Sequence, residues 1–268
     1  MSKILRILLF SVFLLSFATS IFASSDQAYK DYIFQFDTYR TKNAEFLVAK
    51  NEYEKFKSLS SETGALDKTK LMLSQRDQLL RAYLLLLNEK LNETKGMNTT
   101  DRNLYQTLIA NEVMFLQKHS TIVTSIGSLQ DASNVSSELE SHYGVLQSSI
   151  RQTILGISVG VLLELKSQLD DVLNRTQVLI NTNRGIFLPQ KQATVDRWLL
   201  QIDDKRILFQ QKIDSILAVS AKFRGSSSII EMDRTFQEQK SQILEAKQYL
   251  IEAQSYIKEV MTTLKYQN

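Results

Sequence analysis

Apolar residues recur at every seventh position along most of this chain, and this spacing restricts it to long helices that lie along one another. In the C-terminal segment the seventh positions are Ile229, Phe236, Ile243, Leu250, Ile257 and Leu264. The positions three residues after them are Met232, Gln239, Ala246, Ala253 and Val260. This is the a/d pattern of a coiled coil, and a strict seven-residue repeat in a helix of about 3.6 residues per turn imposes a left-handed supercoil.

The same spacing occurs in most of the remaining chain. One further seam is Val195, Ile202, Phe209, Ile216 and Phe223. Another is Leu66, Leu73, Leu80 and Leu87, joined by Leu84 and Leu91. A third is aromatic and consists of Tyr32, Tyr39, Phe46 and Tyr53, supported by Phe36, Ala49 and Phe56. Repetition of one pattern in several segments predicts an antiparallel coiled-coil bundle or a rod of helical hairpins.

Glycine and proline mark the ends of these segments. The 268 residues include one Pro and eight Gly, far fewer than a turn-rich β architecture needs, so the chain is predicted to be all-α. Most of these residues lie in short polar stretches between periodic segments. The predicted helices are 26–58, 65–94, 100–126, 135–182, 190–224 and 227–266. Thr99 to Asp101 and Ser226 to Ser228 offer side-chain oxygens that could cap the third and sixth helices.

The boundary near Gly64 allows two interpretations. The apolar stripe continues through Gly64, so the first two predicted helices could form one helix of about 65 residues, roughly 100 Å long. The segment SLSSETG, however, places three Ser, one Thr and one Gly in seven positions, and this composition favours a turn. We expect a turn.

The run ILGISVGVLL at residues 154–163 contains no charged residue. One seam enters it from upstream through Ile154, Ile157 and Val161. A second leaves it through Leu155, Leu162 and Leu169, with partners predicted at Ser158, Leu165, Val172 and Leu179. Ile157 and Leu155 lie on opposite faces of a helix, so this run is expected to be covered by protein on both sides. Ten residues are too few to cross a bilayer, and Gly156 and Gly160 would let another backbone approach closely.

The first 23 residues have the layout of a secretory signal peptide. Lys3 and Arg6 precede an apolar stretch from Ile7 to Ala18, and SIFAS places Ile21 and Ala23 at the −3 and −1 positions of a cleavage site. The alternative is an uncleaved anchor, because residues 7–23 are uncharged and reach the lower limit of a membrane span. We expect an exported protein in the periplasm, at the cell surface or outside the cell.

Removing the signal changes the charge balance. The chain carries 32 basic and 29 acidic residues, and the signal contains two of the basic ones and no acid, which leaves 30 against 29. Such a balance without a basic cluster argues against nucleic acid as a partner. The chain has no Cys and therefore no disulfide, so residues 24–268 must be stabilised by packing. We expect one extended helical domain, which could divide into halves 24–127 and 128–268.

No catalytic, cofactor-binding or metal-binding residues are predicted. The two histidines, His119 and His142, have no catalytic motif around them, and His119 lies among apolar residues at the edge of a seam. The acidic doublets at 170–171 and 203–204 are the best candidates for metal ligands, but solvated helix faces have the same spacing. We therefore expect a protein that is not an enzyme.

Two surface features remain. Tyr29, Tyr32, Phe34 and Phe36 form a dense aromatic group, which is either a seam with a capping cluster or a docking patch. Four glycosylation sequons begin at Asn92, Asn98, Asn134 and Asn174, and whether they are used depends on the host.

Three segments in the first third of the mature chain carry a resemblance: YIFQFDTYR, FLVAKNEYEKFKSLSSETGAL and KTKLMLSQRDQLLRAYLLLLNEKL. They resemble stretches of uncharacterised exported all-helical proteins of uncultivated bacteria. The resemblance implies export and helicity, and it implies no activity.

The sequence therefore favours an exported, non-enzymatic scaffold, adaptor or spacer of the cell envelope. It would act through a protein partner or through a second copy of itself, and it would meet the membrane only through the signal or anchor segment. One alternative is an extracytoplasmic ligand-sensing or solute-binding bundle, whose site would lie where Gly156, Ser158 and Gly160 leave room. A further alternative is an amphipathic lipid-binding protein.

Overall fold

The computed structural model describes residues 25–220 and 228–265, and the predicted signal lies outside them. The described residues form six α-helices and one short 3-10 helix, with no strand among them. In chain order these are α2 (Ser25–Phe56), α3 (Leu59–Glu93), α4 (Thr99–Thr124), α5 (Leu129–Asn183), η1 (Arg184–Ile186), α6 (Pro189–Ser220) and α7 (Ile229–Lys265). The predicted all-α class is confirmed.

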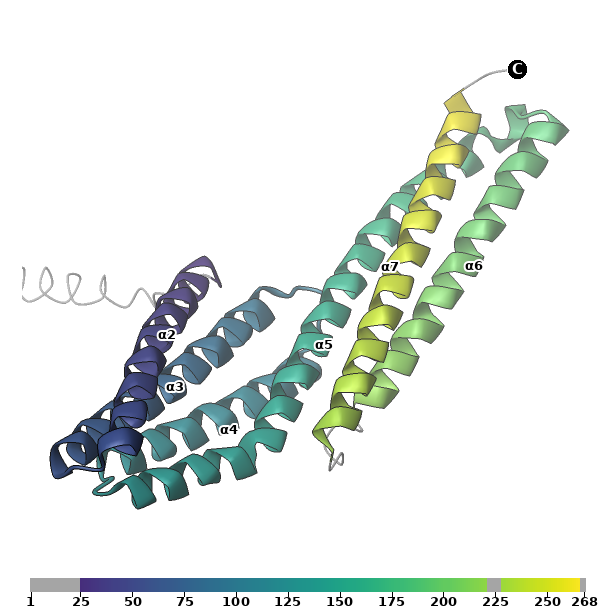
Figure 1. Cartoon of the computed structure of the whole chain (residues 1–268). Helices are drawn as coiled ribbons and strands as arrows, with labels where there is room; N and C mark the ends of the chain where they lie inside the picture. Colours follow the sequence, from purple (N-terminus) through teal and green to yellow (C-terminus); the bar gives the residue numbers. More distant parts are fainter. Residues whose placement is uncertain (1–24, 221–227, 266–268) are drawn as a thin grey trace, which may run out of the picture.

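Two helical bundles share the long helix α5 (Figure 1). The first half of α5 packs with α3 and α4, and α2 lies against α3. The second half packs on α7, which forms a hairpin with α6. At about 1.5 Å per residue, the 55 residues of α5 extend for roughly 80 Å. The hydrophobic clusters of the two bundles meet within α5, between Ile157 and Val159, and not in the turn at 127–128.

The chain turns between α2 and α3, but six residues before Gly64. Lys57 adopts a positive φ of 48°, and Ser58 caps α3 through a capping box with Ser61. The serines of SLSSETG thus start a helix instead of forming the loop itself, because their hydroxyls satisfy the free N–H groups of the first turn. Gly64 lies inside α3, where an added Cβ would meet no atom within 4 Å. A turn was predicted correctly, and its position was wrong.

Two other helices also begin earlier than predicted. The N-cap of α4 is Asn98, whose side chain accepts a hydrogen bond from the Asp101 N–H. Helix α5 starts at Leu129 instead of residue 135, because Ser128 accepts a hydrogen bond from the Asp131 N–H. Ser226 and Ser227 lie outside the described residues, and Ser228 accepts a long hydrogen bond from Glu231 N–H at 3.5 Å.

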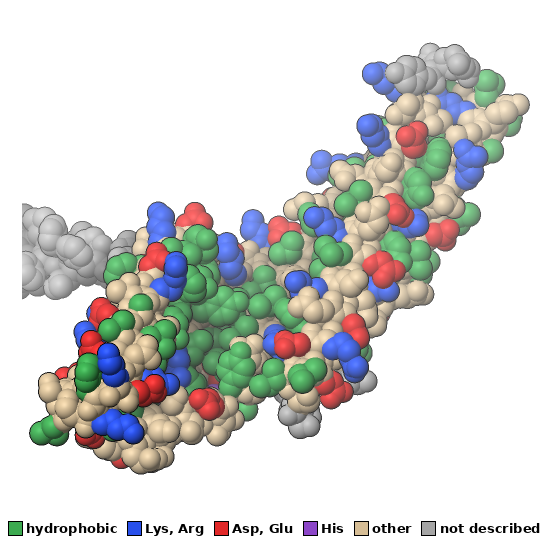
Figure 2. Space-filling model, viewed as in Figure 1, with side chains coloured by type: hydrophobic (Ala, Val, Ile, Leu, Met, Phe, Trp, Pro, Cys, Tyr) green, Lys and Arg blue, Asp and Glu red, His purple; other side chains and the backbone are tan. Residues whose placement is uncertain are grey.

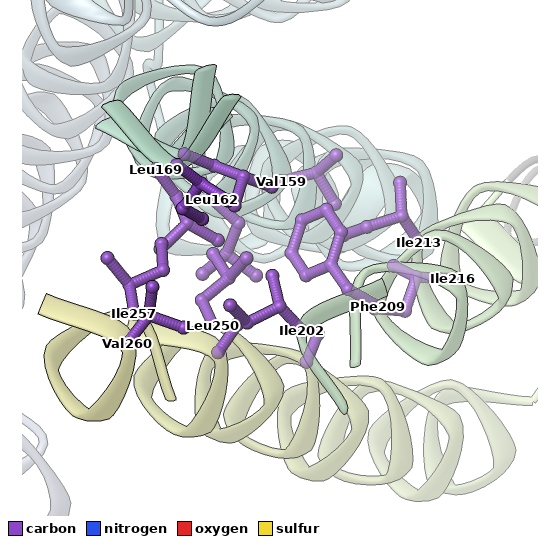
Figure 3. Packing of buried hydrophobic residues seen from close by; sticks show 14 of the residues in the cluster. Val159, Leu162, Leu169, Ile202, Phe209, Ile213, Ile216, Leu250, Ile257 and Val260 are labelled. Carbon is purple, nitrogen blue, oxygen red and sulfur yellow. The ribbon is translucent and has the colours of Figure 1, made fainter. Parts of the chain in front are cut away.

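The predicted seams of α6 and α7 form the core of the C-terminal bundle. Buried a positions of α6 are Val195, Ile202, Phe209 and Ile216, and the buried d positions of α7 run from Met232 to Val260. Figure 3 shows Phe209 and Ile213 of α6 packed toward Leu162 and Val159 of α5. The repeats of α6 and α7 therefore pack against each other and against α5, whereas Ile229, at the start of the α7 seam, is 41% exposed.

The second seam of α5 differs from the predicted one. Leu155, Leu162 and Leu169 are buried as expected, but the second buried row lies four positions after the first: Val159 follows Leu155, Leu173 follows Leu169, and Ile180 follows the buried Thr176. The predicted partner row is not buried, because Leu165, Val172 and Leu179 are exposed by 40–50%. The seven-residue repeat of Leu155, Leu162 and Leu169 does not say whether the second buried row lies three or four positions later. Packing against α7 decides between the two.

The run 154–163 is covered on opposite faces, as predicted. Ile154 and Ile157 pack against the N-terminal core, whereas Val159 and Leu162 belong to the C-terminal core. Only Val161 of this run is exposed, at 46%. By length and composition the helix from Leu129 to Ile186 could cross a membrane, but 67% of its most apolar window is buried inside the fold. A core helix has the same property.

Glycines bring α5 close to the turn before α4. A Cβ at Gly156 would overlap the ring of Tyr105, and one at Gly160 would overlap the methyl of Thr94. A Cβ at Gly96 would in turn overlap the carbonyl oxygen of Gly160. The predicted close approach at Gly156 and Gly160 is therefore present, and it joins α5 to the N-terminal bundle.

Replacing Leu162 with Asp should strongly destabilise the protein. Leu162 is 3% exposed in the C-terminal core, so the variant places an unpaired carboxylate among apolar side chains. We expect a loss of about 3 kcal/mol or more in the free energy of unfolding, measured by denaturant titration followed by circular dichroism. The control is Gln168→Asp on the exposed side of the same helix, which should change stability by less than about 0.5 kcal/mol. Equal losses in the two variants would contradict the burial of Leu162.

Candidate functional site

Helix α2 is the least buried helix of the fold. Its only buried residues are Ser25 and Ala28, at its first turn. It packs along α3, where the rings of Tyr32 and Tyr83 lie 5.4 Å apart and Lys68 forms an ion pair of 2.8 Å with Glu45. A helix attached along one side leaves the rest of its surface available for contacts outside the chain.

That surface is apolar near the start of α2. Tyr29 is 54% exposed, and Ile33 and Phe36 are exposed by 37% and 39%. These three residues are spaced four and three apart, so they share one helix face, which we call the α2 face. Phe34, at 66% exposure, lies beside it. Exposed aromatic residues gathered in this way are typical of a protein-binding surface.

The α2 face borders a wider apolar surface. Tyr32 connects it to Tyr83 of α3. Tyr83 is partly buried and packs against the N-terminal core, as do Ile154 and Ile157 of α5. Figure 2 shows hydrophobic side chains gathered in the hollow between α2 and α5. Of the aromatic group predicted from the sequence, Tyr32 belongs to the seam, whereas Tyr29, Phe34 and Phe36 are exposed as a docking patch requires.

The ligand site predicted near Gly156, Ser158 and Gly160 is filled by protein. The ring of Tyr105 lies against Gly156, and the side chains of Thr94 and Met97 lie against Gly160. Ser158 donates its hydroxyl hydrogen bond to the carbonyl of Ile154. The small residues therefore serve helix packing instead of enclosing a pocket.

The first aspartate of each acidic doublet is paired with cations of the chain. Arg206 donates to Asp170 at 2.8 Å and to Asp203 at 2.9 Å, and Lys166 donates to Asp170 at 2.7 Å. Burial raises the pKa of Asp170, but the hydrogen bonds from Lys166 and Arg206 outweigh it and lower the pKa below the usual value. Among the described residues, no group of three or more His, Cys, Asp or Glu side chains is placed to hold a metal ion.

His119 forms a buried ion pair that the sequence did not reveal. Its Nδ1 lies 2.7 Å from Oδ2 of Asp77, both side chains are fully buried, and its Nε2 lies 2.9 Å from the carbonyl oxygen of Val135. Both neighbours are acceptors, so only the doubly protonated ring donates to both. The hydrogen bond to Asp77 raises the pKa of His119 above its usual value, although burial opposes this.

His142 lies in a second polar group close to the first. Its Nε2 lies 2.7 Å from Oε2 of Glu112, whose Oε1 accepts a hydrogen bond of 2.9 Å from the Ser149 hydroxyl. Phe115 stacks on His142 with ring centroids 3.6 Å apart and lies 6.0 Å from His119. A carboxylate, not an imidazole, faces Ser149, so this is not the arrangement of a nucleophilic triad. The polar groups instead link α3, α4 and α5.

No protein-family model, curated protein or solved structure matches this chain.

Replacing His119 with Gln should lower stability and remove a pH dependence. The substitution removes the cation that is hydrogen-bonded to the buried Asp77 carboxylate, for which we expect a loss of about 3–5 kcal/mol at pH 6. A raised pKa means that the contribution of His119 is fully present below about pH 6.5 and is lost as pH rises through its folded value. The advantage of the unmodified protein over the variant should shrink from pH 6 to pH 9 in denaturant titrations.

His142→Gln is the control for this experiment, because that ring is 24% exposed and does not contact Asp77. It should retain the decrease of stability above pH 6.5. Loss of that decrease in His142→Gln, or its persistence in His119→Gln, would assign the effect to another group.

Proposed function

We propose that this chain is an exported, non-enzymatic helical scaffold or adaptor of the cell envelope that acts through protein–protein contacts. The observation that carries the proposal is the α2 face, where Tyr29, Ile33 and Phe36 are exposed on a helix that lies mainly against α3. Aromatic side chains contribute much of the binding energy of protein interfaces.

Export is supported by the signal-like layout of residues 1–23. The non-enzymatic role is supported by the state of the two histidines. Both ring nitrogens of His119 are occupied by Asp77 and Val135, and Phe115 covers His142. General acid–base catalysis needs a group that reaches a substrate.

Binding should depend on the α2 face and not on the stability of the fold. The variant Tyr29→Gln/Ile33→Gln/Phe36→Gln keeps helix-forming residues and removes exposed apolar surface, so its stability should change by about 1 kcal/mol or less. Chemical cross-linking in the native envelope, read by mass spectrometry, should lose the contacts of α2 in this variant. Light scattering of the purified protein tests whether the partner is a second copy.

The matched control is Val48→Gln/Phe56→Gln, which removes apolar side chains that are 60% and 62% exposed elsewhere on α2. It should keep the cross-links of the unmodified protein. Identical cross-links in both variants would show that the α2 face is not the binding surface. A large loss of stability in the triple variant alone would show that these residues hold the fold together.

A further inference from the structure

A second apolar surface lies at the far end of the C-terminal bundle, where α5 and α7 end and η1 leads into α6 (Figure 1). A pocket of about 830 Å³ is formed there. Its apolar walls are Leu179, Ile186, Phe187, Leu188, Met261 and Leu264. This volume is within the range of roughly 300–1,000 Å³ that is usual for small-molecule sites.

Four of the six apolar side chains of this pocket are open to solvent, whereas Phe187 and Leu264 pack against the C-terminal core. Ile186 is 76% exposed and Leu188 is 56% exposed, although both lie in a short connection where polar residues would serve as well. Leu179 and Met261, which face the pocket from the two long helices, are 48% and 43% exposed. The packing of the bundle does not account for the four exposed residues, because they lie outside its core.

The charged residues of the pocket are all cations. Lys191, Lys258 and Lys265 line it, and no described lining residue is acidic. The ammonium of Lys191 lies 5.1 Å from the centre of the Phe187 ring and donates to the carbonyl of Leu264 at 3.4 Å, which holds a positive charge against the apolar wall. The pocket thus combines hydrocarbon walls with a positive rim, and this combination complements a ligand that has an apolar body and an anionic head.

A narrow groove between α5 and α7 extends the apolar surface along the bundle. A second pocket of about 420 Å³ is lined by Leu165 and Val172 of α5 and by Ile251 of α7, with Lys247 beside them. Leu165, Val172 and Leu179 are seven residues apart and therefore lie along one side of α5. This row leads to the pocket at the end of the bundle, and an elongated apolar surface suits a linear hydrocarbon chain.

We propose that the pocket formed by the ends of α5 and α7 and by η1 binds the alkyl chain of an amphipathic anion, whose carboxylate or phosphate head is held by Lys191, Lys258 and Lys265. The ligand can come from solution as a single-chain amphiphile or from a bilayer as an anionic lipid, since both present the same chemistry. This site lies on a different bundle from the α2 face and does not depend on the function proposed for that face.

The test is calorimetric titration of the full chain with dodecyl phosphate below its micelle concentration. We expect saturable binding of one molecule per chain. Butyl phosphate, which has the same head and a short chain, should bind at least tenfold more weakly, and so should dodecyl glucoside, which has the same chain and a neutral head. Absence of saturable binding here and in the vesicle experiment below would overturn the proposal.

Two variants with the same net charge locate the site. Lys191→Gln/Lys258→Gln/Lys265→Gln should weaken binding at least tenfold. The control Lys30→Gln/Lys95→Gln/Lys118→Gln removes three exposed lysines from the other bundle and should stay within twofold of the unmodified protein. Equal weakening of binding in the two variants would show that only the net charge of the protein matters, and it would refute the site. Thermal melts establish that both variants are folded.

Vesicle co-sedimentation separates the two sources of ligand. Binding to phosphatidylglycerol vesicles but not to phosphatidylcholine vesicles, lost only in the Lys191/Lys258/Lys265 variant, assigns the site to a membrane lipid. Binding of dodecyl phosphate without vesicle binding assigns it to a free amphiphile. The variant of the α2 face should behave like the unmodified protein in both experiments, so a failure of one proposal leaves the other intact.

Discussion

The architecture depends on one helix that must be apolar on opposite faces. Helix α5 supplies Leu146 and Ile150 to one core and Leu162 and Leu169 to another. Within the run 154–163, residues of both cores lie on opposite faces of the same helix. A single continuous helix therefore fixes how the two bundles are joined. Thr153 and Ser158 hydrogen-bond to carbonyls of the preceding turn, a pattern that bends helices, and α5 changes direction between the bundles (Figure 1).

The two bundles use different means of stabilisation. The C-terminal bundle is held by regular apolar seams, with Ala246 and Ala253 allowing α6 and α7 to pack closely. The N-terminal bundle contains buried polar groups, in which Asp77 and His119 join α3 to α4. Such pairs contribute little net stability compared with apolar residues, but removing one partner is costly, so they favour one arrangement of the helices. Helix α2 is added to this bundle at its edge, and this explains why its aromatic residues remain exposed.

Much of the fold could be predicted from periodicity, and several elements could not. The seven-residue repeat located the buried positions of α6 and α7, because every turn of a bundle helix meets the same environment. The partner row of α5 was predicted incorrectly, because Val172 and Leu173 are both apolar and only packing in the C-terminal core shows that Leu173 is the buried one. The pairing of His119 with Asp77 was missed because these residues are 42 positions apart and no local pattern connects them. The aromatic group around Tyr29 could be identified in the sequence, but its exposure to solvent could be read only from the structure.

The sequence by itself determined that this chain is helical, that its helices associate lengthwise, and that residues 154–163 are covered on opposite faces. These are properties of local spacing, which the geometry of a single helix converts into faces. Only the tertiary structure decided which faces meet. It left Leu165, Val172 and Leu179 beside a groove, placed three lysines around an apolar pocket, and enclosed an ion pair between α3 and α4. The reason is that burial and pKa depend on neighbours from distant parts of the chain, and helical periodicity carries no information about them.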